Sequence, residues 1–160
     1  AMNATRIRFI EKLMEEHRVP MRVYGHWSRT RIRYSRYNSF HGHITQAEYR
    51  NITSRSSMSL VIPNDENRDE YTGRTYYVPA SGVFLLAKRT PTHQELFEEG
   101  LEAEFFDTVE ECADKYRYYS RNESARRKIA EQGYRRSIRS GYSLREALSR
   151  VWTEIEQTVN

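Results

Sequence analysis

The residues best suited to chemistry follow the apolar run Met58 to Ile62. This segment, residues 63–74, reads PNDENRDEYTGR and leads into a predicted helix from Thr75 to Ala80. Backbone N–H groups at a helix start, the helix dipole and guanidinium groups all favour a bound phosphate. Arg68 and Arg74 therefore indicate an anion site. A solvated loop whose charges pair with one another fits the same residue types, which alone leave both interpretations open.

A second chemically distinctive segment is residues 26–40, which lack apolar periodicity and predict an irregular loop. Arginines and aromatic rings are interleaved there, a composition found on surfaces for single-stranded nucleic acid or acidic proteins. The formal net charge is only +4, too small to indicate nucleic acid. We interpret the segment as an exposed basic-aromatic loop, with docking as the alternative. Its arginines and rings are Arg29, Arg31, Arg33, Arg36, Trp27, Tyr34, Tyr37 and Phe40.

Metal and thiol chemistry find little support in the sequence. His41 and His43 would share one face of an extended segment, but no third ligand lies nearby, so we predict no metal site. Cys112 is the only cysteine, which excludes an intramolecular disulfide. It falls on the apolar stripe of a predicted helix and is expected to be a buried, inert thiol.

Length and hydrophobic pattern bound the fold that must position these residues. The 160 residues predict a single domain over residues 1–160. The longest apolar run, Val83 to Ala87, has five residues, whereas about 18 are needed to cross a bilayer. No signal-peptide pattern opens the chain. We therefore expect a cytoplasmic protein without a membrane span.

Short apolar strands alternate with amphipathic helices, which predicts an α/β fold: three layers, Rossmann-like, around a mostly parallel sheet of about five strands. A ligand is then expected beyond the carboxyl ends of the strands, in the loops after Tyr24, Ile62 and Ala87, with Gly25 at the first of them. Capping boxes are predicted at Thr92/Glu95, Asp107/Glu110 and Ser143/Glu146. The predicted strands are 21–24, 58–62, 83–87 and 103–106; the predicted helices lie near 5–17, 46–53 and 69–80, followed by a short helix opening at Thr92 and three closing helices.

Several motifs resemble those of the spore-maturation-type (CgeB-like) glycosyltransferases, in the order and at about the spacing of that family. The resemblance covers the chain from about Phe40 to the C-terminus. The longest motif is residues 67–87, NRDEYTGRTYYVPASGVFLLA. The others are Glu95–Gly100, Glu102–Phe106, Tyr118-Tyr119, Arg127-x-Ile129-Ala130-x-x-Gly133 and Gly141-Tyr142-Ser143.

The resemblance implies the C-terminal, nucleotide-sugar-binding half of a two-domain GT-B enzyme, which transfers a sugar from a nucleoside diphosphate to an acceptor. By this mapping Arg74 and Arg68 face the diphosphate. Asn64 and the backbone of Pro79, Ser81 and Gly82 lie close to the nucleotide. Arginines and backbone amides can neutralise a diphosphate leaving group, so no metal or other cofactor is expected.

Two departures from the family pattern bear on activity. Many relatives carry a glutamate for the ribose hydroxyls where this chain has Tyr77, and a phenol makes only one such hydrogen bond. The acceptor-binding N-terminal domain, which usually supplies the catalytic base, is also missing, so catalytic residues remain unknown and we expect no sugar transfer by this chain alone. The alternative is a binding module that keeps the fold without transfer activity.

Overall fold

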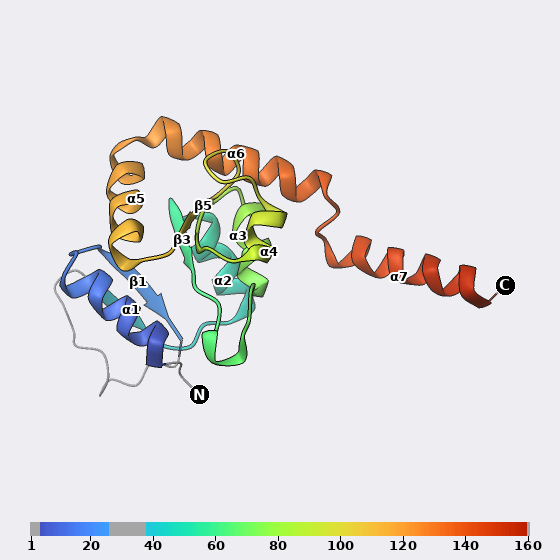
Figure 1. Ribbon diagram of the computed structural model, residues 1–160, viewed down its shortest axis with the longest axis horizontal. Coiled ribbons are helices and arrows are strands. Elements are labelled where there is room, and N and C mark those ends of the chain that lie inside the picture. The colour runs from blue at the N-terminus through green and yellow to red at the C-terminus, as the bar shows by residue number, and fades with distance from the viewer. Residues whose placement is uncertain (1–3, 26–37, 160) are drawn as a thin grey trace.

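The predicted alternation of strands and helices is present in the computed structural model, which describes residues 4–25 and 38–159 (Figure 1). The basic-aromatic loop lies outside the described residues, except that 38–40, placed in that loop from sequence, belong to a strand. The elements are α1 (Ala4–Glu15), β1 (Met21–Tyr24), β2 (Asn38–His41), α2 (Gln46–Ser54), β3 (Met58–Val61), the 3-10 helix η1 (Asp65–Asn67), α3 (Gly73–Ala80), β4 (Phe84–Lys88), α4 (Pro91–Leu96), β5 (Glu104–Phe106), α5 (Val109–Arg121), α6 (Glu123–Arg139) and α7 (Leu144–Val159).

All strand pairings are parallel, as predicted, but the described strands form two sheets rather than one of about five strands. β1 pairs with β2, and β4 lies between β3 and β5. The sequence shows which residues are extended, but it does not show which strand edges pair. In the structure, a two-stranded and a three-stranded sheet stand in place of the expected single sheet.

Two apolar layers cover the three-stranded sheet, because successive side chains on a strand point to opposite faces. Phe84 and Leu86 of β4 pack in one cluster with α1, α5 and α6, which we call the α1 face. Leu85 and Ala87 pack in the other cluster with Val78 of α3, which we call the α3 face. These four side chains of β4 are all buried, on both faces of the sheet. Their burial on both faces explains why the strand is an uninterrupted apolar run in the sequence.

A glycine allows α6 to pack closely on the α3 face. Gly133 is buried in the middle of α6, and a Cβ at this position would collide with the backbone oxygen of Glu102 and approach the ring of Pro79. Close packing of α6 on the segment that precedes β5 therefore depends on the missing side chain.

The helix starts differ in detail from the predicted capping boxes. α4 begins at Thr90, whose hydroxyl accepts from the N–H of His93, and not at Thr92. α5 is capped by Thr108 rather than by Asp107. The prediction is confirmed at Ser143, whose hydroxyl accepts from the N–H of Glu146 at 3.2 Å. The two observed caps lie one or two residues from the predicted ones. Several adjacent Thr and Asp residues are suitable N-cap residues, so the sequence does not single out one of them.

The last helix departs from the body of the molecule. α7 extends away from the other elements (Figure 1), and its apolar stripe faces outward instead of packing on a core. More than half of each described stripe side chain is exposed: Leu148, Val151, Trp152 and Ile155. No helix in residues 4–25 and 38–159 combines the length and the apolar character that crossing a membrane requires.

Candidate functional site

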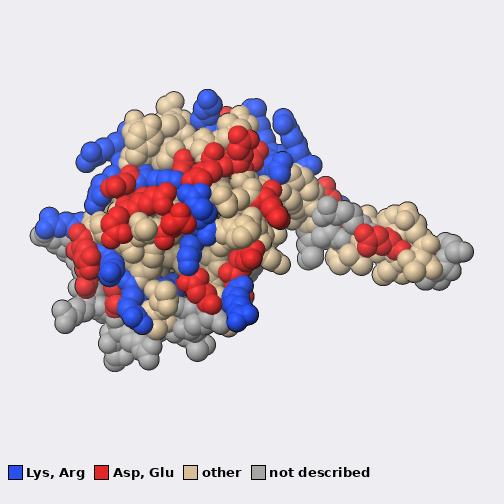
Figure 2. All heavy atoms as spheres, in the orientation of Figure 1, with Lys and Arg blue, Asp and Glu red and all other residues tan. Residues whose placement is uncertain are grey.

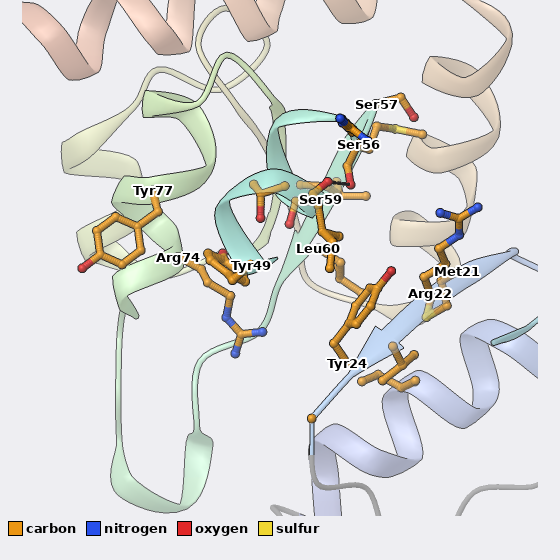
Figure 3. A pocket seen from close by; sticks show the side chains of 18 of the residues that line it. Met21, Arg22, Tyr24, Tyr49, Ser56, Ser57, Ser59, Leu60, Arg74 and Tyr77 are labelled. Atoms are coloured by element: carbon orange, nitrogen blue, oxygen red, sulfur yellow. Dashed lines mark hydrogen bonds between the residues drawn. The ribbon is translucent and has the colours of Figure 1, made fainter. Parts of the chain in front are cut away.

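A cleft of about 1320 Å³ lies between the two sheets (Figure 3). β1 lines one side of it, and β3 with α2 lines the other. At its mouth lie Tyr24 and Gly25, where β1 ends, and Arg74 in the first turn of α3. A site beyond the carboxyl ends of parallel strands is the position that such a sheet favours for a ligand.

Arg74 is the most prominent charged group at the mouth. It is exposed, and within the described part of the chain its guanidinium forms no ion pair. Figure 3 shows its side chain extending from α3 toward the mouth of the cleft, on the same side as Tyr49. An uncompensated guanidinium beside the start of a helix favours an anionic ligand.

Tyr49 of α2 supplies a second polar group there. Its hydroxyl oxygen is buried and has no hydrogen-bond partner among the described residues. Buried hydroxyl groups in folded proteins are nearly always bonded to protein or to ordered water. The hydroxyl of Tyr49 is therefore an unsatisfied polar atom in the wall of the cleft.

Hydrogen bonds fix the start of α3, and with it the position of Arg74. The N–H of Thr72 donates to the hydroxyl of Thr75 at 3.1 Å, and the Thr72 hydroxyl accepts from the N–H of Arg74 at 3.2 Å. Thr75 and His93 are fully buried. Their side chains meet at 2.9 Å, between Oγ1 of Thr75 and Nε2 of His93. The first turn of α3 is thus held from the β4–α4 segment.

The ring of His93 is oriented by its second nitrogen. Nδ1 lies 2.6 Å from the backbone oxygen of Lys88. A carbonyl only accepts, so Nδ1 carries the proton and Nε2 accepts from the hydroxyl of Thr75. Burial lowers the pKa of His93, which keeps the ring neutral near pH 7 and preserves this arrangement.

The loop before α3 is anchored at both ends. The carboxylate of Asp65 pairs with the Lys88 ammonium at 2.9 Å. The hydroxyl of Thr90 donates to the backbone oxygen of Glu70 at 2.7 Å, and Thr92 donates to the Glu70 carboxylate from its N–H and its hydroxyl. Thr92, predicted from sequence to cap a helix, instead holds this loop.

Three of the residues predicted from sequence for the site lie together in the cleft lining: Gly25, Arg74 and Tyr77. Tyr77 lies one turn beyond Arg74 on α3 and is 53% exposed. Asn64 and Arg68 flank η1 outside the lining. The Arg68 side chain is exposed, and its backbone adopts the left-handed conformation, with φ 56°.

The other three predicted residues lie at the opposite end of α3 from Arg74. Pro79 is buried on the side of α6. The hydroxyl of Ser81 donates to the backbone oxygen of Tyr77 at 2.7 Å. Gly82 has φ +70°, the left-handed conformation that ends many helices. In this structure these residues end α3 and do not line the cleft.

The loop after Ala87 was a third candidate from sequence, and its cation is already neutralised. Arg89 pairs with Glu99 and Asp107, and these carboxylates raise its pKa. Lys115 joins the cluster through Glu99 and the buried Glu104, each at 2.7 Å. Figure 2 shows Lys and Arg intermixed with Asp and Glu over this face of the body, with no extended patch of one sign. Arg74, without such partners, is the better candidate for an anion.

Metal and thiol chemistry find no site in the described residues. Residues 4–25 and 38–159 hold no group of three His, Cys, Asp or Glu side chains able to hold a metal ion. The ring of His41 stacks on Tyr24, with 4.7 Å between ring centroids. Cys112 is 1% exposed, as expected, and burial raises the pKa of its thiol to about 12.

Sequence reasoning did not single out Tyr49 or His93. Neither belongs to a motif: Tyr49 lies in an unremarkable short helix, and His93 is a single histidine within a predicted cap. Their roles come from burial against segments distant in sequence. The only available signal for Tyr49 was its helix, which directly precedes the strand leading into the loop with Arg68 and Arg74.

The parallel α/β layers and a cleft at the strand ends are compatible with a Rossmann-like fold. Residues 6–151 match the model of a family described as glycosyl transferase-like. The match covers most of the chain, so the chain belongs to the glycosyl transferase-like family. A comparison with curated proteins finds no match.

Proposed function

We propose that this chain is the nucleotide-sugar-binding half of a GT-B glycosyltransferase, similar to the CgeB-like enzymes. In this proposal the mouth of the cleft binds the donor. The single observation that carries it is the exposed guanidinium of Arg74, directed to the mouth from the first turn of α3 without an ion-pair partner in the described part of the chain.

The chemistry of sugar transfer requires such a group. When the glycosidic bond to a nucleoside diphosphate breaks, negative charge develops on the leaving diphosphate. A fixed cation beside a helix N-terminus stabilises that charge without a metal. The hydrogen bonds from His93 through Thr75 to Thr72 support this role, since they hold the turn that carries Arg74.

The remaining donor contacts are assigned by position. Gly25 allows close backbone approach where β1 ends, with φ 119°. The exposed Tyr77 offers one hydrogen bond to a ribose hydroxyl. Asn64 and Arg68 serve as a secondary flank of the site, whereas Pro79, Ser81 and Gly82 support α3 from its far end.

Titration with ligands that carry or lack the diphosphate tests the proposal. We expect UDP-glucose or GDP-mannose, and the corresponding free diphosphate, to bind in calorimetry more tightly than the nucleoside alone. We also expect the affinity to fall as salt is raised, because the diphosphate supplies the charge. A nucleoside that binds as tightly as its diphosphate, or the absence of binding by every donor, would contradict the proposal.

A non-catalytic binding module is the second candidate, favoured by one observation. Tyr77 stands at a lining position of the cleft where many relatives carry a carboxylate for the ribose. An assay for sugar transfer with the purified chain separates the two roles of the domain. We expect donor binding without turnover, and measurable turnover would show that this chain contains its own catalytic groups.

A further inference from the structure

Helix α6 carries an excess of positive charge. It contains six Lys and Arg but only two Glu, a formal charge of +4, which equals that of the whole chain. Two of these cations, Arg126 and Arg136, donate to the backbone oxygens of Tyr119 and Leu96. Figure 2 shows Lys and Arg side chains projecting along the edge of the body that α6 forms. The exposed cations of the helix are Arg127, Lys128, Arg135 and Arg139.

These four cations lie on one side of α6, which we call its outer face, because positions three, four and seven apart recur on the same side of a helix. The buried Ile129 and Gly133 lie on the opposite side. Lys128 and Arg139 form no ion pair within residues 4–25 and 38–159. The other two pair only with glutamates four residues earlier on the same helix. Exposed pairs of this kind are weak, so the outer face can engage an anionic partner.

Large apolar side chains accompany these cations. Ile138 is 58% exposed and Tyr134 43% exposed, and both lie on the outer face of α6. A short connection then leads into α7, whose exposed apolar stripe includes Trp152. Exposed apolar groups that gather in this way mark interaction surfaces in folded proteins. The partner of this part of the molecule must therefore offer both negative charge and apolar groups.

An anionic lipid bilayer offers both, because charged headgroups cover a layer of acyl chains. Nucleic acid supplies phosphates but no apolar layer for the α7 stripe. A second copy of the chain would bring an α6 face of the same positive sign to the contact. The indole of Trp152 also fits a bilayer, since tryptophan is enriched at the boundary between headgroups and acyl chains. Among these partners, the bilayer satisfies both helices.

We propose that the outer face of α6 and the apolar stripe of α7 form a docking surface for an anionic lipid bilayer. The cations of α6 contact the headgroups, and the stripe of α7 enters the boundary between headgroups and acyl chains. The chain lies on the bilayer through these helices without crossing it. Electrostatic attraction and apolar insertion together give stable binding, whereas one signal alone gives weak binding. The proposal rests on the two helices and does not depend on the proposed function.

Sedimentation of the full chain with vesicles tests the contribution of α6. We expect binding to vesicles of phosphatidylcholine with phosphatidylglycerol and little binding to phosphatidylcholine alone. Each Lys or Arg near an anionic surface increases binding about fivefold, so Lys128→Gln combined with Arg139→Gln should reduce the partition coefficient about 25-fold. The matched control combines Arg8→Gln with Arg50→Gln, which removes the same charge from exposed positions of α1 and α2. The control should bind as the parent chain does.

The fluorescence of Trp152 tests the contribution of α7. Trp27 is the only other tryptophan, so the Trp27→Phe variant reports Trp152 alone. With the anionic vesicles its emission should shift to shorter wavelength, and lipids brominated on their acyl chains should quench it. Neutral vesicles should leave the emission unchanged.

Three results would overturn the proposal. The first is an absence of binding to the anionic vesicles. The second is an equal loss of binding in the two double variants, which would assign the contact to another basic segment such as residues 26–37. The third is binding that leaves the emission of Trp152 unchanged. Sedimentation velocity without lipid should show a monomer, and a dimer whose formation shifts the Trp152 emission would assign the stripe to a second copy instead.

Discussion

The hydrogen bonds of His93 allow a quantitative prediction for the start of α3. His93→Phe keeps a ring of similar size but removes both ring nitrogens. The hydroxyl of the fully buried Thr75 and the backbone oxygen of Lys88, which is partly buried, then lose these partners. Each unsatisfied buried group costs about 1–3 kcal/mol, so we expect the free energy of unfolding to fall by about 2–5 kcal/mol.

A double-mutant cycle in urea unfolding separates this bond from general packing. Thr75→Val removes the hydroxyl while retaining its volume, and in the His93→Phe background it should cost less than alone, with a coupling of about 1 kcal/mol or more. Additive effects of the two substitutions, or a loss below about 0.5 kcal/mol for His93→Phe, would refute the reasoning.

The same histidine predicts a pH dependence. Burial lowers the pKa of His93 in the folded state below its usual value of 6.5, so the unfolded chain binds the proton more readily. The stability from this group is therefore present above pH 6.5 and is lost as the pH falls toward the folded-state pKa. Urea midpoints between pH 7.5 and 5 should fall less steeply for His93→Phe than for the parent chain, and equal slopes would contradict this assignment.

Three further predictions follow from single contacts. Gly133→Ala should reduce the urea midpoint by the equivalent of about 1–3 kcal/mol, because its methyl group meets the backbone of Glu102, whereas Gly42→Ala, with open space around it, should change little. Cys112 should resist alkylation in the native protein at pH 8 and react after unfolding, since burial raises its pKa to about 12; fast native labelling would contradict this. The ion pair with Arg89 lowers the pKa of Glu99 to about 2, so its stabilising contribution should be lost between pH 4.5 and 2, and Glu99→Gln should flatten that part of the acid unfolding curve.

The local elements could be predicted from sequence because their signals are local. Met21 to Tyr24 is a short run ended by Gly25, and the structure has a strand with these bounds. The buried run after Gly82 became β4 with a shift of one residue. α7 was also found, but periodicity predicts only an apolar stripe and not whether another surface covers it.

The arrangement of the sheets and half of the candidate site depend on contacts between distant segments. The division into two sheets could not be predicted, because strand pairing is set by packing between segments far apart in sequence. Arg74 was found through its helix start and the family resemblance. Tyr49 and His93 were not, because burial alone gives them a role. Pro79, Ser81 and Gly82 share a motif with Arg74, yet the helix separates them from it in space.

The most direct measurement for the proposed function compares donor affinity in two arginine variants. Arg74→Ala removes the guanidinium at the cleft mouth, and Arg139→Ala removes an exposed guanidinium from α6, outside the cleft lining. Hydrogen bonds to a charged group contribute about 1.5–3 kcal/mol, equivalent to a loss of about 10- to 100-fold in affinity. Calorimetry with UDP-glucose or GDP-mannose should show this loss for Arg74→Ala and unchanged affinity for Arg139→Ala. Equal affinities in the two variants would contradict the assignment of the donor site.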